Sequence, residues 1–407
     1  MHTRYGSLLL AALMLCVGGQ AMTASAQNKF VQDRFAIGFW VDPPADDNMD
    51  QHYADIAAAN FTMVIGGFGA ATPENVVKQL ALCEKYDLKA VVARGGLATA
   101  DLPDSPACWG YMIQDEPSAP GFAGLAPIVK EIRDLKPGRF GYINLLPNYA
   151  NEQQLGTATY DEHVRRFMEE VGTDVLSMDH YPMMQPGADS RQTYCDNLEV
   201  MRKYSLQFNV PHWNFFNSMP FGPHFDPTEH AMRWQVYTAV AYGSKGVLYF
   251  CYWTPGGGEF PKGGAIITAE GRKTRHYDQA TRINAALKAL GPTIMQLTSS
   301  SVTRLKPGAD NADALAQTPL KSIDGGANGD YLLGCFKHAD GRRAVLLNNY
   351  DFVYTSWPTV EFAVDPAQVV EISQETGKEM PVVDDSPVMP GLQLSLDAGS
   401  GRLFLLP

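Results

Sequence analysis

Short apolar runs recur along the first two thirds of the chain, and segments with a helical repeat of apolar positions separate them. Eight runs are rich in Val, Ile, Phe, Trp or Tyr, and several are apolar almost without interruption. Continuous apolarity is typical of a strand covered on both faces, as in a parallel sheet. The runs are Phe35–Val41, Phe61–Gly67, Leu88–Arg94, Trp109–Gln114, Phe140–Leu145, Val175–Tyr181, Pro211–Asn217 and Gly246–Trp253.

Helical patterns occupy the gaps between these runs. Thr72 is a predicted N-cap, because Pro73 follows it at the first helical position and apolar residues then recur at helical spacing. A second helix, Gly121–Leu135, ends at a Lys-Pro-Gly stop signal. Strand and helix alternating eight times predict a (β/α)8 barrel.

A doubly wound open sheet is the main alternative for such an alternation. In its dinucleotide-binding form, this fold has a glycine-rich turn after the first strand. Here Asp42, Pro43 and Pro44 follow the first run, so that turn is excluded. The barrel is therefore the preferred fold.

The pattern changes after about residue 300, where the helical period disappears and short β-type runs follow. Turn signals separate these runs, which predicts a small antiparallel β-sandwich. The segment Gly308–Gly329 reads as an irregular loop. The predicted domains are a barrel over residues 27–300 and a sandwich over residues 301–407. The runs are Tyr331–Lys337, Ala344–Asn349, Val360–Phe362, Val369–Ser373, Leu392–Leu396 and Arg402–Leu406.

The first 26 residues predict a cleaved signal peptide. A short basic start precedes the apolar run Leu8–Val17, and Ala24-Ser25-Ala26 matches a signal-peptidase site. We therefore expect a periplasmic or secreted protein. No later apolar stretch is long enough to predict a transmembrane helix.

Composition limits the classes of partner. The 407 residues carry a formal net charge of −12 and no Lys/Arg cluster, which argues against nucleic-acid binding and docking on anionic lipid. Five of the six cysteines follow the predicted cleavage site, with no zinc-like spacing. A disulfide between Cys83 and Cys108 is compatible with an oxidising compartment. The sequence leaves the oligomeric state open.

Candidate chemistry lies at the ends of the predicted strands, because active sites of (β/α)8 barrels form there. The fourth run ends abruptly in Asp115 and Glu116, and Pro117 stops the strand. Apolar walls around such a carboxyl group raise its pKa and keep it protonated for acid catalysis. We predict Glu116 as the general acid; Asp115 either takes part in catalysis, orients a neighbour or caps the next helix.

The sixth run ends in the second group of polar residues, Asp179, His180 and Tyr181. Asp179 is the candidate second carboxylate, as base, nucleophile or charge stabiliser. His180 and Tyr181 are candidates for binding sugar hydroxyls. A metal site that uses Asp179 and His180 is a weaker alternative, and we predict neither a metal nor an organic cofactor.

Aromatic and amide side chains complete the predicted substrate site. Flat rings pack against the C–H faces of sugars, and Trp and Tyr keep a polar group for hydroxyls. The predicted carbohydrate-binding residues, besides His180 and Tyr181, are Trp40, Asp42, Arg94, Asn144, Asn214, Asn217, Tyr252 and Trp253.

The motif Asp115-Glu116-Pro117 resembles the Asn-Glu-Pro of clan A glycoside hydrolases, in which that Glu is the acid/base. The run Leu396–Phe404 resembles the last strands of their C-terminal β-sandwich, and the segment 229–253 is similar to barrels related to glycoside hydrolase family 42. The resemblance implies a barrel that hydrolyses O-glycosidic bonds in an oligo- or polysaccharide.

The seventh run departs from this family, because clan A places its nucleophilic Glu there and His212–Ser218 contains no carboxylate. Asp115 also replaces the Asn of the motif. Either Asp179 or a loop residue supplies the second carboxylate, or the barrel binds glycan without cleaving it. An adjacent Asp-Glu pair also resembles hexosaminidase-type barrels, in which the substrate's acetamido group is the nucleophile. A sugar lyase or isomerase is a further alternative.

Overall fold

The structure is a computed structural model that describes residues 28–261 and 263–407. The predicted signal peptide lies outside these residues, so its cleavage and the export of the protein stay predictions. Across the described residues, no helix has both the length and the apolarity to cross a membrane.

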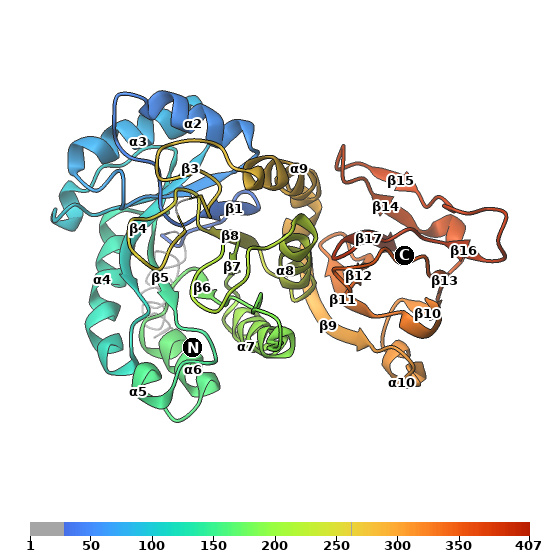
Figure 1. Ribbon diagram of the computed structural model, residues 1–407. Helices are drawn as coiled ribbons and strands as arrows, with labels where there is room; N and C mark the ends of the chain where they lie inside the picture. Colours follow the sequence, from blue (N-terminus) through green and yellow to red (C-terminus); the bar gives the residue numbers. More distant parts are fainter. Residues whose placement is uncertain (1–27, 262) are drawn as a thin grey trace, which may run out of the picture.

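Eight parallel strands form the barrel on the left of Figure 1, and each lies beside the next around the ring. The ring closes between β1 and β2, where the backbone N–H of Thr62 donates to the carbonyl of Ile37 at 2.9 Å. The predicted (β/α)8 fold is confirmed. The strands are β1 (Ala36–Phe39), β2 (Met63–Ile65), β3 (Lys89–Val92), β4 (Cys108–Asp115), β5 (Phe140–Leu145), β6 (Leu176–Asp179), β7 (His212–Asn217) and β8 (Gly246–Phe250).

Helices cover the outside of the barrel, and Thr72 caps one of them as predicted, with its hydroxyl accepting from the N–H of Asn75. The connection between β3 and β4 differs from the predicted alternation, because its described residues contain only the 3-10 turn η1 (Thr99–Asp101). Two glycines and two prolines in this short connection disfavour a full helix. The helices are α2 (Met49–Ala58), α3 (Pro73–Lys85), α4 (Phe122–Leu135), α5 (Glu152–Leu155), α6 (Tyr160–Glu170), α7 (Arg191–Phe208), α8 (Glu229–Ala241) and α9 (Arg275–Met295), with the 3-10 turn η2 (Ala119–Gly121) before α4.

Large side chains fill the barrel interior, and the alternation of each strand decides which residues lie there. On β7, Trp213 and Phe215 belong to the interior cluster, whereas Phe216 packs with the surrounding helices. On β6, Met178 also packs outward. Since successive side chains of a strand point to opposite faces, only every second strand residue can reach a site inside the barrel.

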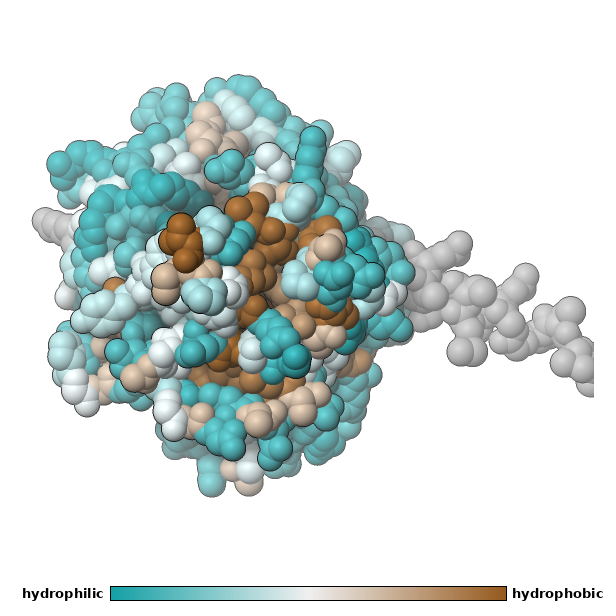
Figure 2. Space-filling view, turned by 90° about the vertical axis from the view of Figure 1, so that its right-hand side faces the viewer, coloured by the Kyte–Doolittle hydropathy of each residue, from teal (hydrophilic) through white to brown (hydrophobic). Residues whose placement is uncertain are grey.

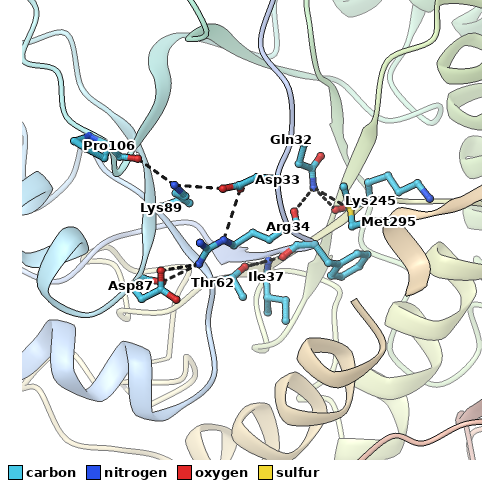
Figure 3. Close-up of polar contacts among 11 residues, drawn as sticks. Gln32, Asp33, Arg34, Ile37, Thr62, Asp87, Lys89, Pro106, Lys245 and Met295 are labelled. Carbon is cyan, nitrogen blue, oxygen red and sulfur yellow. Dashed lines mark hydrogen bonds and ion pairs between the residues drawn. The ribbon is translucent and has the colours of Figure 1, made fainter. Parts of the chain in front are cut away.

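The segment 28–35 closes the end of the barrel at which the strands begin. Phe30 packs against Trp109 and Phe140 with ring centroids 5.6 and 4.5 Å away. Gln32 donates to the carbonyl of Lys245 at 2.7 Å (Figure 3). Its amide oxygen accepts from the indole N–H of Trp213 at 3.0 Å. A ligand therefore enters the barrel from the opposite end, where the strands terminate.

Two antiparallel sheets follow the barrel, which confirms the predicted C-terminal sandwich (Figure 1). The larger sheet has the order β15-β14-β17-β12-β11-β9, and the smaller has the order β10-β13-β16. The strands are β9 (Leu297–Leu305), β10 (Leu320–Asp324), β11 (Tyr331–His338), β12 (Arg343–Asn349), β13 (Thr359–Phe362), β14 (Val370–Ile372), β15 (Glu379–Pro381), β16 (Leu392–Gln393) and β17 (Gly401–Leu406).

The segment Gly308–Gly329 is more ordered than the loop predicted from its sequence. It contains the short helix α10 (Ala312–Leu315), the strand β10 and the 3-10 turn η3 (Gly326–Asn328). A further 3-10 turn, η4 (Pro366–Gln368), precedes β14. The prediction of an irregular loop was wrong because β10 exposes most of its residues and therefore lacks a clear apolar pattern.

The central strands of the larger sheet, β11, β12 and β17, are buried on both faces. Leu333 and Cys335 of β11 face the smaller sheet, whereas Leu332 and Phe336 pack with the barrel helices. Helix α8 lies against β11 and β12, between the barrel and the sandwich (Figure 1). A Cβ atom on Gly334 would lie 2.5 Å from the carbonyl oxygen of Ala241, so the sheet and the helix approach closely.

Figure 2 shows the side of the molecule formed by the C-terminal sandwich, with apolar side chains among polar ones. Large apolar side chains exposed in this domain are Val353, Tyr354, Trp357, Met380, Val383, Val388 and Met389. Two exposed aromatic residues lie in the barrel and not in the C-terminal domain: Phe68 follows β2, and Tyr149 follows β5. Both therefore lie at the open end of the barrel.

Candidate active site

A pocket of about 170 Å³ opens where the barrel strands end. Three carboxylic acids and one amide line one part of it, and aromatic rings line the rest. The lining residues are Trp40, Asp115, Glu116, Asn144, Asp179, Tyr181, Phe215 and Phe250. Six of these eight were predicted to form the site.

Strand β4 supplies the first two carboxylic acids. Asp115 is its last residue, and Glu116 follows in a left-handed backbone conformation with φ +47°. The N–H of Glu116 donates to the carbonyl of Asn144 on β5 at 2.8 Å, which holds this conformation. A left-handed non-glycine residue costs about 1–2 kcal/mol, and such residues are frequent at functional sites.

Strand β6 supplies the third carboxylic acid, and it contacts Glu116 directly. Asp179 is 6% exposed. The carboxyl groups of Glu116 and Asp179 lie close enough to influence each other's pKa, and a hydrogen bond with Asp179 contributes to the pKa of Glu116. Burial, the neighbouring Glu116 and then Asp115 raise the pKa of Asp179 well above its ordinary value.

The pKa of Glu116 is also raised, first by desolvation and then by the charge of Asp115, whereas the hydrogen bond with Asp179 opposes the shift. Asp179 is the more buried of the two, so burial destabilises its ionised form more than that of Glu116. Two carboxyl groups in contact titrate as a unit and retain one proton over a wide pH range.

Asn144 fixes the geometry of this acidic cluster. Its amide nitrogen donates to Asp115 at 3.3 Å and to Asp179 at 3.0 Å. Its amide oxygen accepts from the hydroxyl of Ser177 at 3.0 Å, and the hydroxyls of Ser177 and Tyr142 are 2.9 Å apart. The polar atoms of Asn144 are thus engaged within the protein, and through them Asn144 positions the carboxyl groups of Asp115 and Asp179.

A Ser177→Ala variant tests this network. Both the amide oxygen of Asn144 and the hydroxyl of Tyr142 would lose a buried partner, which should lower the free energy of unfolding by about 1–3 kcal/mol. We expect kcat to fall about tenfold with little change in KM, and the pH profile of kcat to shift. Ser177→Thr, which keeps the hydroxyl, should restore the stability, the kcat and the pH profile of the wild type. A loss of stability with an unchanged pH profile of kcat would show that Ser177 has a purely structural role.

The aromatic part of the pocket comes from four strand ends. Trp40 and Phe215 meet edge to face at 5.6 Å, and the ring of Tyr181 lies 5.2 Å from that of Phe250. Phe215 belongs to both the interior cluster and the pocket. Flat apolar rings opposite a carboxyl cluster suit a ring-shaped substrate with apolar faces and a polar edge.

Two predicted binding residues point away from the pocket because of strand alternation. His180 lies between Tyr181 and Asp179 in sequence but faces outward, and its Nδ1 is 3.0 Å from the amide oxygen of Asn197. Burial lowers the pKa of His180 to about 4, so it is neutral at physiological pH. Asn214 donates to the hydroxyl of Tyr194 at 2.7 Å, behind β7.

Asp42, Arg94 and Asn217 lie outside the pocket lining and contact loops or turns. The carboxylate of Asp42 accepts three backbone N–H groups of the loop after β2. Arg94 lies 3.5 Å from the hydroxyl of Thr99 in η1. The side chain of Asn217 accepts from the N–H of Met183 at 3.3 Å.

The aromatic residues after β8 also lie outside the pocket lining. Tyr252 is buried against Phe39 and Phe61, with ring centroids 4.4 and 5.7 Å away. Trp253 packs edge to face on His52 at 5.1 Å. Both rings therefore stabilise the outer layer of the barrel.

Besides Phe215, two further residues near the acidic cluster were not predicted. Phe250 lines the pocket, and it lies two residues after the inward-facing Leu248. The phenol of Tyr149 lies near Asp179 and Glu116, and their charges add to desolvation in raising its pKa. Alternation along β8 would have indicated Phe250, whereas nothing in the local sequence indicates Tyr149.

A larger cleft, of about 440 Å³, separates the loop after β6 from the C-terminal domain. Two of its carboxylates form ion pairs, Asp189 with Arg191 at 2.6 Å and Asp330 with Arg304 at 2.5 Å. Because arginine side chains hold both of these carboxylates, the smaller barrel pocket is the better candidate for acid catalysis.

Neither a metal cluster nor a disulfide accompanies the site. In the described part of the chain, His, Cys, Asp and Glu do not gather in groups that would hold a metal ion. The sequence allows a disulfide between Cys83 and Cys108, but in the structure both cysteines are free thiols, and both are buried. Burial raises the pKa of both thiols, consistent with cysteines that act as small apolar residues.

Similarity to known proteins lies in the fold. No protein-family model matches the chain, and no curated protein matches it in sequence. A GH42 β-galactosidase from G. stearothermophilus aligns with 92% of this chain and 98% of its own, at 9% identity and a TM-score of 0.61. A β-galactosidase from Bacillus circulans sp. alkalophilus aligns with 92% and 99%, at 11% identity and a TM-score of 0.55.

A third β-galactosidase, from the haloarchaeon Halorubrum lacusprofundi, has 14% identity and a TM-score of 0.50. That alignment covers 63% of this chain and 59% of the other, so the chain spans about three fifths of that enzyme's length. At identities this low the likeness establishes the fold. The chain therefore has the barrel fold of these clan A glycoside hydrolases, and the predicted resemblance in fold is confirmed.

Proposed function

We propose that this protein hydrolyses O-glycosidic bonds in an oligo- or polysaccharide, with Glu116 as the general acid. The observation that carries the proposal is the hydrogen-bonded pair of Glu116 and Asp179 in a pocket with aromatic walls. The pair stores a proton beside a surface suited to a sugar ring. The shared fold of β-galactosidases supports the same class of reaction.

Substrate binding drives the transfer of a proton from Asp179 to Glu116. A sugar that covers Glu116 removes water from its carboxylate, which destabilises the ionised form and draws the shared proton from Asp179 to Glu116. Glu116 then protonates the glycosidic oxygen as the bond to the anomeric carbon breaks. Asp179 is left as a carboxylate near the positive charge that develops on the sugar.

The contact between the carboxyl groups limits the role of Asp179. Glycosidases separate their two carboxyl groups by about 5–5.5 Å for retention or about 6.5–9.5 Å for inversion. A hydrogen-bonded pair is closer than either, so Asp179 serves as the proton partner of Glu116. We assign capture of the anomeric carbon to water held by Asp115, the remaining carboxylate of the pocket.

Incubation of the mature protein with a panel of oligo- and polysaccharides in ¹⁸O-labelled water tests the proposal. Hydrolysis gives products with one added water, and the label appears at the new reducing end. An unlabelled, unsaturated product would instead show a lyase. Glycan binding by calorimetry without any product would show a non-catalytic barrel, and either result would overturn the proposal.

A further inference from the structure

We propose that Phe68, together with Trp40, forms a second sugar-binding position beside the pocket, which makes the protein act on oligosaccharides in preference to single sugar units. The inference rests on the proposed function, since it names the class of substrate that the same site takes. It depends on the position, exposure and support of one aromatic side chain.

Phe68 extends the aromatic wall of the pocket toward solvent. It is 51% exposed, and it packs edge to face on Trp40 with ring centroids 5.3 Å apart and planes at 71°. Trp40 lines the pocket itself. Because the rings are steeply inclined, Phe68 offers its face to a different sugar unit from the one that Trp40 contacts inside.

The loop that carries Phe68 is held rigidly from below. The carboxylate of Asp42, which is 2% exposed, accepts the N–H groups of Phe68, Gly69 and Ala70 at 2.8, 2.9 and 2.9 Å. Burial of Asp42 raises its pKa, and the three backbone hydrogen bonds oppose that shift. Burying a carboxylate costs free energy unless hydrogen bonds compensate for the lost water. Here the compensating bonds come from the backbone of the loop, so Asp42 holds the backbone of the exposed Phe68 in place.

Close packing adds to this support. A Cβ atom on Gly69 would lie 1.7 Å from the carbonyl oxygen of Pro43, so the loop rests directly on the segment after β1. Phe68 therefore cannot sink into the core to bury its ring without moving Asp42 and Pro43. Because the backbone of Phe68 is already fixed, a ligand that covers the ring need not order the loop, which reduces the entropy lost on binding.

The chemistry of the position favours a saccharide. An exposed apolar ring next to a substrate pocket gains by covering its face, and the C–H faces of a pyranose supply a flat apolar partner. The hydroxyl groups at the edge of the same sugar stay in water. A second unit of the chain whose first unit occupies the pocket meets both requirements.

Phe68→Ala tests the proposal with substrates of two lengths. We expect about a tenfold increase in KM for an oligosaccharide, with kcat nearly unchanged and no change in KM for an aryl glycoside of one sugar. Phe68→Trp should restore the wild-type KM. Trp357→Ala is the matched control, because Trp357 is 53% exposed but lies in the C-terminal domain.

Binding measurements separate this proposal from the hydrolytic one. Calorimetry of the oligosaccharide with Glu116→Gln should give a Kd that Phe68→Ala weakens about tenfold, even if the wild-type protein releases no product. A weaker Kd for Phe68→Ala together with no product from the wild-type protein would support the sugar-binding position and reject hydrolysis. Equal weakening for the one-unit ligand and the oligosaccharide, or none for either, would overturn the role of Phe68.

Discussion

A Glu116→Gln variant is expected to lose about 10²–10⁴-fold in kcat on a natural glycan, with little change in Kd. Glutamine matches the size of Glu116 and can still hydrogen-bond to Asp179, but it has no proton to give to the glycosidic oxygen. Steady-state kinetics and calorimetry on the same oligosaccharide measure the two quantities. Full activity of this variant would disprove the assignment of the acid.

The leaving group distinguishes a lost acid from a damaged pocket. A phenol of low pKa leaves without protonation, so Glu116→Gln should be much less impaired on an aryl glycoside with such a phenol. An equal loss on both substrates would indicate a disturbed pocket. Glu131→Gln, the same substitution on the exposed face of α4, is the matched control and should leave kcat unchanged.

The barrel could be predicted because its strands are apolar on both faces. That pattern is rare outside parallel sheets, and it marked all eight strands within a few residues of their ends. Prediction failed where tertiary context decides the structure. Strand β10 pairs with β13 although it exposes most of its residues, so it showed no apolar pattern.

The same apolar pattern explains why only part of the site could be predicted. When both faces of a strand are apolar, the sequence does not show which residues point into the barrel. Asp179 and Tyr181 face the pocket, and His180 between them does not. On β7, Phe215 lines the pocket, whereas the predicted Asn214 lies behind the strand.

The contact between Glu116 and Asp179 was also beyond the sequence. The same residue, Glu116, has a left-handed backbone, a conformation that non-glycine residues rarely adopt and that its sequence neighbours do not indicate. The sequence placed the two carboxyl groups at the ends of strands β4 and β6 but did not show whether they meet. The hydrogen bond that contributes to the pKa of Glu116 is the reason why we propose Asp179 as its proton partner.

An Asp179→Asn variant is expected to lose activity at neutral pH, by about 100-fold, and to shift its optimum to lower pH. Asparagine donates a hydrogen bond to the Glu116 carboxylate but stores no proton for it. Its N–H group keeps Glu116 ionised, so acid catalysis needs protons from more acidic solvent. The pH dependence of kcat measures the shift, and an unchanged optimum would contradict the shared proton.

Asp179→Asn, which is expected to lower activity at neutral pH, should raise stability relative to the wild type as pH increases. The pKa of Asp179 lies above its ordinary value of 3.8 in the folded protein. Above pH 3.8, the folded state therefore retains a proton that the unfolded state has lost. The free energy of unfolding thus falls as pH rises through that interval.

Asparagine does not titrate, so this loss is absent from the variant, while the raised pKa of Asp115, which does not depend on Asp179, affects both proteins and largely cancels in the comparison. Thermal unfolding from acid to neutral pH should show that the Tm of Asp179→Asn gains on the wild type as pH increases. A Tm difference that does not vary with pH would mean that Asp179 is ionised in the fold. Asp179 would then have no proton to share with Glu116, and the proposed route of the proton would fail with it.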